Sequence, residues 1–166
     1  MSDEIFKRKI APHFDSAYNL ARWLTHSDAD AADILQEAAI KAFRFLASLE
    51  NENSKAWFLA IVRNTAYSWL RKNKDYVDIE ETFDLAAPEA SAEVQLSESI
   101  NAQMLHQALD RLTPTYKEII VLRELEEMAY EDIAVILHVP LGTVMSRLSR
   151  ARAQLKKTLI TLGVTK

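Results

Sequence analysis

The scarcity of glycine and proline restricts what this chain can fold into more than any other feature of its sequence. Only two glycines and four prolines occur in 166 residues. Alanine, leucine, isoleucine and glutamate are abundant instead, and these residues favour helices over strands. The composition therefore predicts an all-α protein.

The absence of cysteine excludes a disulfide framework, a thiolate metal site and a cysteine nucleophile. Gly142 and Gly163 are too far apart for a phosphate-cradling loop, which needs closely spaced glycines. The N-terminus has no basic-then-apolar signal, and the longest uncharged stretch, residues 133–146, is too short to span a bilayer. We expect a cytoplasmic protein without membrane insertion, cofactor or small-molecule substrate.

Apolar residues recur at helical spacing in two groups of segments. The predicted helices cover about residues 5–24, 28–47, 55–72, 100–112, 115–125, 130–137 and 141–162. Ser54 is the expected N-cap of the third. Residues 74–97 interrupt the pattern with Pro88 and a scatter of acids, which is typical of a flexible acidic linker. The sequence thus predicts two small helical domains, residues 1–73 and 98–166.

The net charge of −4 is unevenly distributed along the chain. Residues 1–73 carry 10 basic and 9 acidic side chains, whereas residues 74–100 carry 1 and 8. Beyond Asp132 there are 6 basic side chains and no acid. A local basic face, rather than the global charge, decides whether a protein can bind phosphate.

The last two predicted helices fit a helix-turn-helix, which needs a small residue where the helices cross and buried aliphatic residues beside the turn. Ala134 is the small crossing residue. The aliphatic residues are Ile133, Leu137, Val139 and Val144. His138 occupies the turn position that is usually glycine, and histidine tolerates the left-handed backbone expected there.

The final helix should bury one face and expose another. Val144, Leu148, Ala151 and Leu155 are spaced to point inward. The other face has arginines that suit guanine edges or phosphates and serine hydroxyls that suit either. The predicted duplex contacts are Thr143, Met145, Ser146, Arg147, Ser149, Arg150 and Arg152. Alternatively, a basic C-terminal helix is stabilised by its own dipole and has no such role.

Several blocks of the chain resemble the extracytoplasmic-function sigma factors of bacterial RNA polymerase. Residues 112–134 and 142–152 resemble region 4 of that family, its promoter-distal DNA-binding domain. Residues 30–38 resemble the polymerase-binding helix of region 2, and residues 57–64 its promoter-melting helix. The resemblance implies a sigma factor with region 2 in residues 1–73, region 4 in residues 98–166, and no catalytic or metal site.

The resemblance also implies partners and contact residues. Region 2 would bind the polymerase clamp helices through Asp33, Gln36, Glu37, Lys41 and Arg44. It would melt the −10 element through Asn51, Asn53, Ser54, Trp57, Arg63, Asn64, Arg71 and Lys72. Region 4 would sit on the polymerase flap and read the −35 element. An anti-sigma factor would hold the protein inactive. For Trp57, stacking on a base and burial in the core are both open.

Two departures from the family pattern keep an alternative open. Glu50 and Glu52 place acids in the predicted base-capturing loop, and Met145 stands where a basic residue is common. The alternative is a sigma-like decoy or helix-turn-helix regulator that binds an anti-sigma partner or DNA without directing polymerase. A di-metal bundle enzyme would need inward Glu-x-x-His pairs. No histidine follows a glutamate by three residues: the four are His13, His26, His106 and His138.

Overall fold

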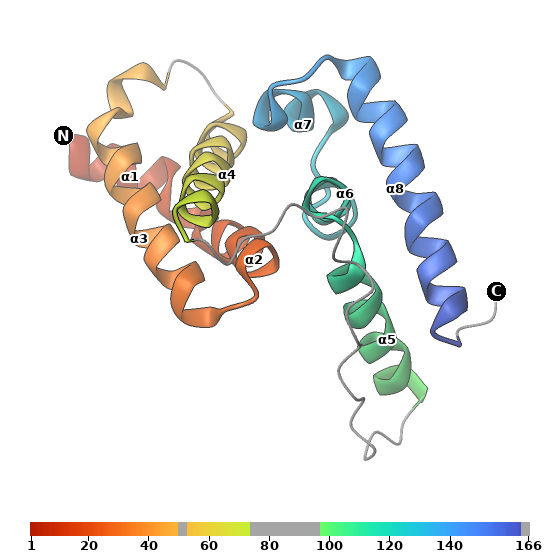
Figure 1. Cartoon of the computed structure of the whole chain (residues 1–166). Coiled ribbons are helices and arrows are strands. Elements are labelled where there is room, and N and C mark those ends of the chain that lie inside the picture. Colours follow the sequence, from red (N-terminus) through yellow and green to blue (C-terminus); the bar gives the residue numbers. More distant parts are fainter. Residues whose placement is uncertain (50–52, 74–96, 164–166) are drawn as a thin grey trace.

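The computed structural model describes residues 1–49, 53–73 and 97–163, and within these residues all regular structure is helical. Figure 1 shows the helices in two groups. The first group contains α1 (Ser2–Lys9), α2 (Phe14–Thr25), α3 (Asp28–Arg44) and α4 (Ser54–Lys72). The second contains α5 (Ser97–Arg111), α6 (Pro114–Ile120), α7 (Tyr130–Leu137) and α8 (Leu141–Thr161). The predicted acidic linker lies outside the described residues, apart from Ser97, which begins α5.

In the N-terminal half, α2, α3 and α4 pack against one another around buried Leu20, Ile34 and Phe58. The prediction of one helix over residues 5–24 is wrong, since a short 3-10 turn at Ala11–His13 separates α1 from α2. Pro12 explains the break, because proline has no N–H group to continue the helical hydrogen bonds.

The N-terminal ends of α3 and α4 are both capped by side chains. Ser27 Oγ accepts a hydrogen bond of 3.1 Å from the Asp30 amide at the start of α3. At α4 the capping group is the Asn53 side chain, which accepts from the Ala56 amide at 3.0 Å. Ser54 is therefore the first residue of the helix. The sequence had predicted Ser54 as the N-cap, and that prediction is wrong.

In the C-terminal half, the predicted helix over residues 115–125 has two parts. The α-helical part is α6, which Thr113 caps by accepting a hydrogen bond from the Tyr116 amide at 3.3 Å. A π-helical turn, Val121–Leu125, follows directly. Within it, the Arg123 guanidinium donates to the Met128 carbonyl at 2.8 Å and lies 4.4 Å from the Tyr130 ring centroid. Arg123 thus fastens α6 to the start of α7.

The helix-turn-helix is confirmed as α7, a short turn and α8. His138 ends α7 with φ 60° and ψ 46°, the left-handed conformation expected at this position. Behind the turn, the buried aliphatic residues are Ile133, Leu137, Val144 and Leu148. These contacts leave the opposite face of α8 free of the core.

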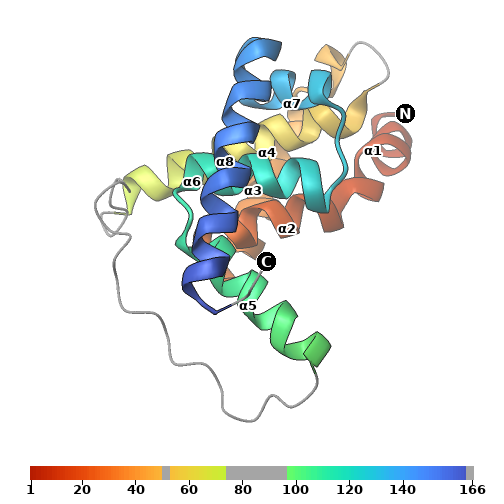
Figure 2. The same cartoon turned by 90° about the vertical axis from the view of Figure 1, so that its right-hand side faces the viewer.

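The two halves also pack against each other, which the sequence did not predict. Helix α4 lies against α7, and α2 lies against α6 (Figure 2). The buried apolar side chains of both halves form one continuous cluster. None of the described helices is both long and apolar enough to cross a membrane.

Candidate nucleic-acid interface

The five predicted polymerase contacts lie together on the outer face of α3. Together with Ile40, they line an open hollow of about 370 Å³. The six lining residues are Asp33, Gln36, Glu37, Ile40, Lys41 and Arg44. The Lys41 ammonium is 3.4 Å from Glu37 and donates to the Thr65 hydroxyl of α4 at 3.2 Å.

Two large apolar side chains on α3 belong to this exposed surface and were not predicted. Ile40 is 52% exposed and Phe43 is 44% exposed. Phe43 also has an edge-to-face contact with Phe6 of α1, with 5.6 Å between the ring centroids. Ile40 lies in the hollow and away from the buried stripe of α3. An isoleucine out of register with that stripe is the sequence signal that could have indicated an exposed apolar surface here. The surface therefore combines both charge signs with apolar area.

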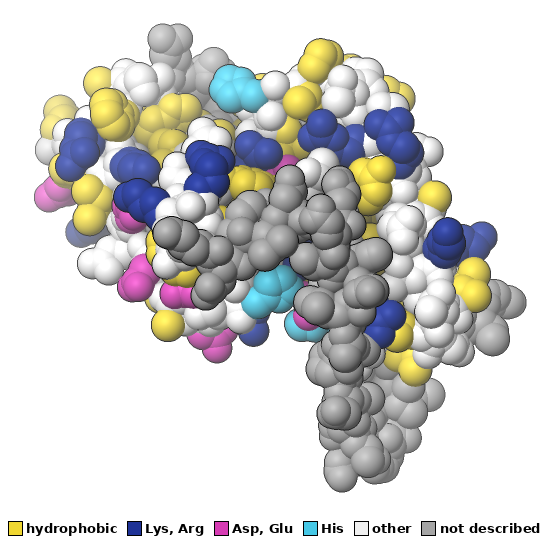
Figure 3. Space-filling model, viewed as in Figure 1, with side chains coloured by type: hydrophobic (Ala, Val, Ile, Leu, Met, Phe, Trp, Pro, Cys, Tyr) yellow, Lys and Arg dark blue, Asp and Glu magenta, His cyan; other side chains and the backbone are white. Residues whose placement is uncertain are grey.

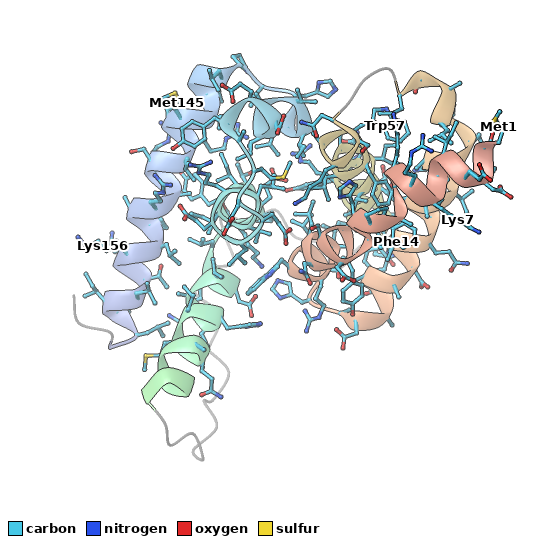
Figure 4. All side chains as sticks on the ribbon, turned by 180° about the vertical axis from the view of Figure 1, so that it is seen from behind. Met1, Lys7, Phe14, Trp57, Met145 and Lys156 are labelled. Carbon is cyan, nitrogen blue, oxygen red and sulfur yellow. The ribbon has the colours of Figure 1, made fainter. Side chains whose placement is uncertain are left out.

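Six of the predicted −10 contacts lie on α4 and Asn53 is its N-cap, whereas Asn51 lies outside the described residues. Asn53, Asn64, Arg71 and Lys72 are exposed. Trp57 is half-buried and packs against the buried apolar cluster that both halves share (labelled in Figure 4). Its ring therefore contributes to the core and retains a partly exposed edge.

Arg63, another predicted −10 contact, is held by the C-terminal half. Its Nε donates to Glu118 Oε1 at 2.7 Å, and its Nη2 donates to Glu118 Oε2 at 3.0 Å. The Glu118 side chain is only 1% exposed, and the Arg63 guanidinium lies 4.6 Å from the Tyr67 ring centroid. Burial raises the pKa of Glu118, against the lowering effect of the Arg63 hydrogen bonds.

Two further polar contacts join α4 to the C-terminal half. Asn53 Nδ2 donates to Asp132 Oδ1 at 2.6 Å, and Lys55 Nζ lies 3.8 Å from Glu126 Oε1. In both contacts, as in the Arg63–Glu118 pair, the donor belongs to α4 or to its N-cap residue, and the acid belongs to the other half. The only sequence signal for this interface was an acid, Glu118, directly before an apolar run.

A second polar cluster joins α2 to α5 and α6. Lys117 Nζ donates to the Trp23 carbonyl at 3.2 Å and lies 2.8 Å from His26 Nε2 and 3.7 Å from Asp110. Because an ammonium can only donate, His26 Nε2 must accept and its proton must sit on Nδ1, 3.4 Å from Asp110 Oδ1. Burial lowers the pKa of Lys117 to about 8, although Asp110 acts in the opposite direction.

This cluster predicts that stability decreases in mild acid. Burial lowers the pKa of His26 below its ordinary value of 6.5, and the charge of Lys117 lowers it further. Asp110 raises this pKa, whereas Arg22 and His106 lower it. The stabilising contribution of neutral His26 is therefore complete above pH 6.5 and is lost as the pH falls through the lowered pKa. Below its pKa of about 8, Lys117 is charged in both the folded and the unfolded state. It therefore adds no pH dependence to the free energy of unfolding in that range.

The measurement is the free energy of unfolding in urea at about pH 7.5 and about pH 5.5, on either side of the ordinary histidine range. His26→Asn should reduce the difference between the two values. His138→Asn is a matched control, because both histidines have φ near 60° and asparagine tolerates that conformation. An equal pH dependence in wild type and His26→Asn would contradict the prediction.

The predicted −35 contacts gather on the outward face of α8. Met145, Ser146, Ser149, Arg150 and Arg152 are exposed, while Thr143 and Arg147 are half-buried. Figure 4 shows Met145 and Lys156 pointing away from the rest of the molecule. Arg152 donates to Glu124 at 2.6 and 2.8 Å, whereas Arg150 forms no ion pair with any described residue. Lys and Arg side chains lie over both halves on the face seen in Figure 3.

Comparison with known proteins accounts for both halves. Residues 10–76 match the family model Sigma-70 region 2, and residues 102–155 match Sigma-70, region 4. The chain is 36% identical to the RNA polymerase sigma factor SigV of Bacillus subtilis over 154 residues, covering 89% of each protein. It is 35% identical to the ECF RNA polymerase sigma-E factor of Escherichia coli K12, over 74% of this chain and 70% of that protein.

This chain belongs to the extracytoplasmic-function sigma factors. Among solved structures, it is similar to the sigma factor RpoE of Bartonella quintana, crystallised in complex with the anti-sigma factor NepR. The TM-score is 0.73 at 28% identity, and the similarity covers 97% of this chain and 99% of that one. A sigma factor binds core RNA polymerase and directs initiation at specific promoters by recognising the −35 element and melting the −10 element. The sigma factor family is in general non-enzymatic.

Proposed function

We propose that this sigma factor divides its work among three surfaces. The hollow on α3 binds the clamp helices of core polymerase, the exposed polar face of α4 holds the melted −10 element, and α8 reads the −35 element as duplex. Residues 1–73 would then act as region 2 and residues 98–166 as region 4. The main supporting observation is α8, which exposes five of seven predicted duplex contacts while burying its opposite face.

The assignment of α8 rests on its shape and chemistry. A major groove admits one α-helix, and a helix-turn-helix presents the N-terminal part of its second helix to the base edges. Met145, Ser146, Ser149 and Arg150 are exposed in the first three turns of α8. Arginine pairs with guanine edges or phosphate, serine with either, and Met145 can contact a thymine methyl.

The assignment of α3 rests on the mixture of side chains around its hollow. Asp33 and Glu37 supply negative charge, Arg44 supplies positive charge, and Ile40 adds exposed apolar area. An apolar centre surrounded by charges is typical of a protein interface. The surface therefore fits a partner helix that carries charges of both signs.

Three further features belong to the same proposal. The chain itself catalyses nothing, and the chemistry of RNA synthesis is done by the polymerase. It works in the cytoplasm, where bacterial polymerase and promoter DNA are found. An anti-sigma factor regulates it, which is supported by the similarity to RpoE in its complex with NepR.

The proposed function is tested by reconstituting core polymerase with this chain and mapping the transcription start sites. We expect start sites that depend on the chain. Arg44→Glu should weaken binding to core polymerase, whereas Lys7→Glu, an exposed charge reversal on α1 outside the hollow, should not. Binding to core polymerase without promoter-specific initiation would instead support the sigma-like decoy.

Arg150 allows a test of the −35 assignment. Arg150→Ala should weaken holoenzyme binding to −35 duplexes by about 1–3 kcal/mol and relax the sequence preference if Arg150 contacts a base. If it contacts phosphate, binding should weaken equally for all sequences. Fluorescence anisotropy measures the change in affinity. The salt concentration is held fixed, because phosphate contacts release counterions and the affinity therefore depends on salt. Lys157→Ala, further along α8, is the matched control; unchanged affinity in Arg150→Ala would remove Arg150 from the interface.

A further inference from the structure

Helix α3 carries a straight row of exposed side chains whose charges are opposite at its two ends. The row, which we call the α3 stripe, consists of Asp33, Glu37, Ile40 and Arg44. Spacings of four, three and four residues place these side chains on one face of the helix. All four line the hollow on α3. The two ends of the stripe are about 16 Å apart along the helix axis.

The charges at the two ends have no partner within the described part of the chain. Neither the Asp33 carboxylate nor the Arg44 guanidinium forms an ion pair or a side-chain hydrogen bond with a described residue. Glu37, in the middle, pairs with Lys41 of the same helix at 3.4 Å. The helix dipole favours Arg44 in the last turn, but it does not account for Asp33, which lies beyond the first turn.

The stripe is complementary to itself when a second copy is turned end to end. In an antiparallel pair of α3 helices, Asp33 of each copy faces Arg44 of the other copy. The two Ile40 side chains then lie next to each other near the centre. A two-fold axis forms both end contacts at once, as an isologous dimer interface requires. A parallel pair would instead set like charges against each other.

Apolar area and free access add to this complementarity. Ile40, Phe43 and Phe45 are all exposed on or beside the stripe. In Figure 1, α3 lies on the outer side of the N-terminal group, away from α5 and α8. A second copy can therefore reach the stripe while the described helices keep their places. Contact along one helix face gives a small interface, which is typical of weak and reversible association.

We propose that the free protein forms a reversible antiparallel homodimer through the α3 stripe. The dimer goes beyond the proposed function, and only its consequence rests on that function. If α3 also binds the clamp helices of core polymerase, the dimer covers the polymerase-binding surface. Self-association and polymerase binding then compete, and the dimer is a reserve of sigma factor that dissociates as polymerase takes up the monomer.

The first experiment measures self-association of the full chain without polymerase or DNA. Sedimentation equilibrium from about 1 to about 300 µM covers the concentrations at which weak complexes form. The average mass should rise from that of one chain towards that of two. It should fall again as salt is added, because the end charges are exposed and salt screens them. A mass that stays at one chain throughout overturns the dimer.

The second experiment reverses the end charges one at a time. Asp33→Arg leaves a base at both ends of the stripe, and Arg44→Glu leaves an acid at both ends. Because of the two-fold axis, each substitution turns both end contacts from attraction into repulsion. Each variant alone should lose at least about tenfold in dimer affinity. Lys157→Glu, an exposed charge reversal on α8, is the matched control and should associate like wild type.

The two weakened variants should rescue each other. In an equal mixture, both bases of the Asp33→Arg copy face both acids of the Arg44→Glu copy, so the mixture should associate although neither variant does so alone. The double variant, Asp33→Arg with Arg44→Glu, should again pair with itself because its polarity is inverted. Such recovery excludes misfolding as the cause of the losses. A mixture and a double variant that stay monomeric overturn the antiparallel contact.

Binding of the same variants to core polymerase separates this inference from the proposed function. The polymerase surface is not inverted with the stripe, so the double variant should dimerise but bind polymerase weakly. If it dimerises and binds polymerase like wild type, the assignment of α3 to polymerase is wrong and the dimer stands. If the wild type stays monomeric while Arg44→Glu still weakens polymerase binding, only the dimer is overturned.

Discussion

Replacing Phe58 by alanine should lower the free energy of unfolding by about 3–5 kcal/mol. Phe58 is fully buried on α4, and its ring centroid lies 5.8 Å from that of Phe14 on α2. The loss has two sources. The removed ring no longer contributes the free energy gained by burying its apolar surface, and a cavity remains between α2 and α4. Urea unfolding followed by circular dichroism measures it.

Asn64→Ala is the matched control for Phe58→Ala, because Asn64 is exposed on the same helix. It should change the free energy of unfolding by less than about 0.5 kcal/mol, as is usual for surface substitutions. Under the proposed function it should nevertheless weaken holoenzyme binding to the melted −10 element. Equal losses of stability in the two variants would mean that the two faces of α4 are wrongly assigned.

Replacing Glu118 by leucine should lower the free energy of unfolding by about 3–5 kcal/mol. The substitution leaves the Arg63 guanidinium largely buried, with a side-chain exposure of 22%, and without its carboxylate. Breaking a buried pair is costly mainly because the remaining charge has neither its partner nor water. The same urea titration measures the loss.

A double-mutant cycle distinguishes this cause from simple misfit. Arg63→Met combined with Glu118→Leu replaces the buried ion pair by apolar side chains, so most of the loss should be recovered. The four proteins to compare are wild type, the two single variants and the double variant. Losses that add in the double variant would show that the two side chains are not energetically coupled.

The sequence predicted much of the fold because each helix buries a periodic apolar stripe. In α8, Val144 and Leu148 are both buried, as their spacing required. The helix break at Pro12 was missed although its cause lies in one residue, since the surrounding apolar spacing continues across it. The π-helical turn at Val121–Leu125 was also missed, because the apolar spacing of five residues does not distinguish a π-helix from an α-helix.

The docking of the two halves could not be predicted from such periodicity. Arg63 and Glu118 are 55 residues apart, and Asn53 and Asp132 are 79 apart. A polar residue on a helix surface looks the same in sequence whether it faces water or a distant acid. The predicted −10 and −35 contacts were placed by chemistry and family resemblance, and their roles in DNA binding stay predictions.

Arg123 holds α6 and α7 in their relative orientation. Its hydrogen bond to the Met128 carbonyl and its contact with the Tyr130 ring bridge the joint between α6 and α7. Helix α6 carries Glu118, while α7 is the first helix of the helix-turn-helix. Because the joint is bridged at both points, the orientation of the recognition helix relative to α6 depends on this single arginine side chain.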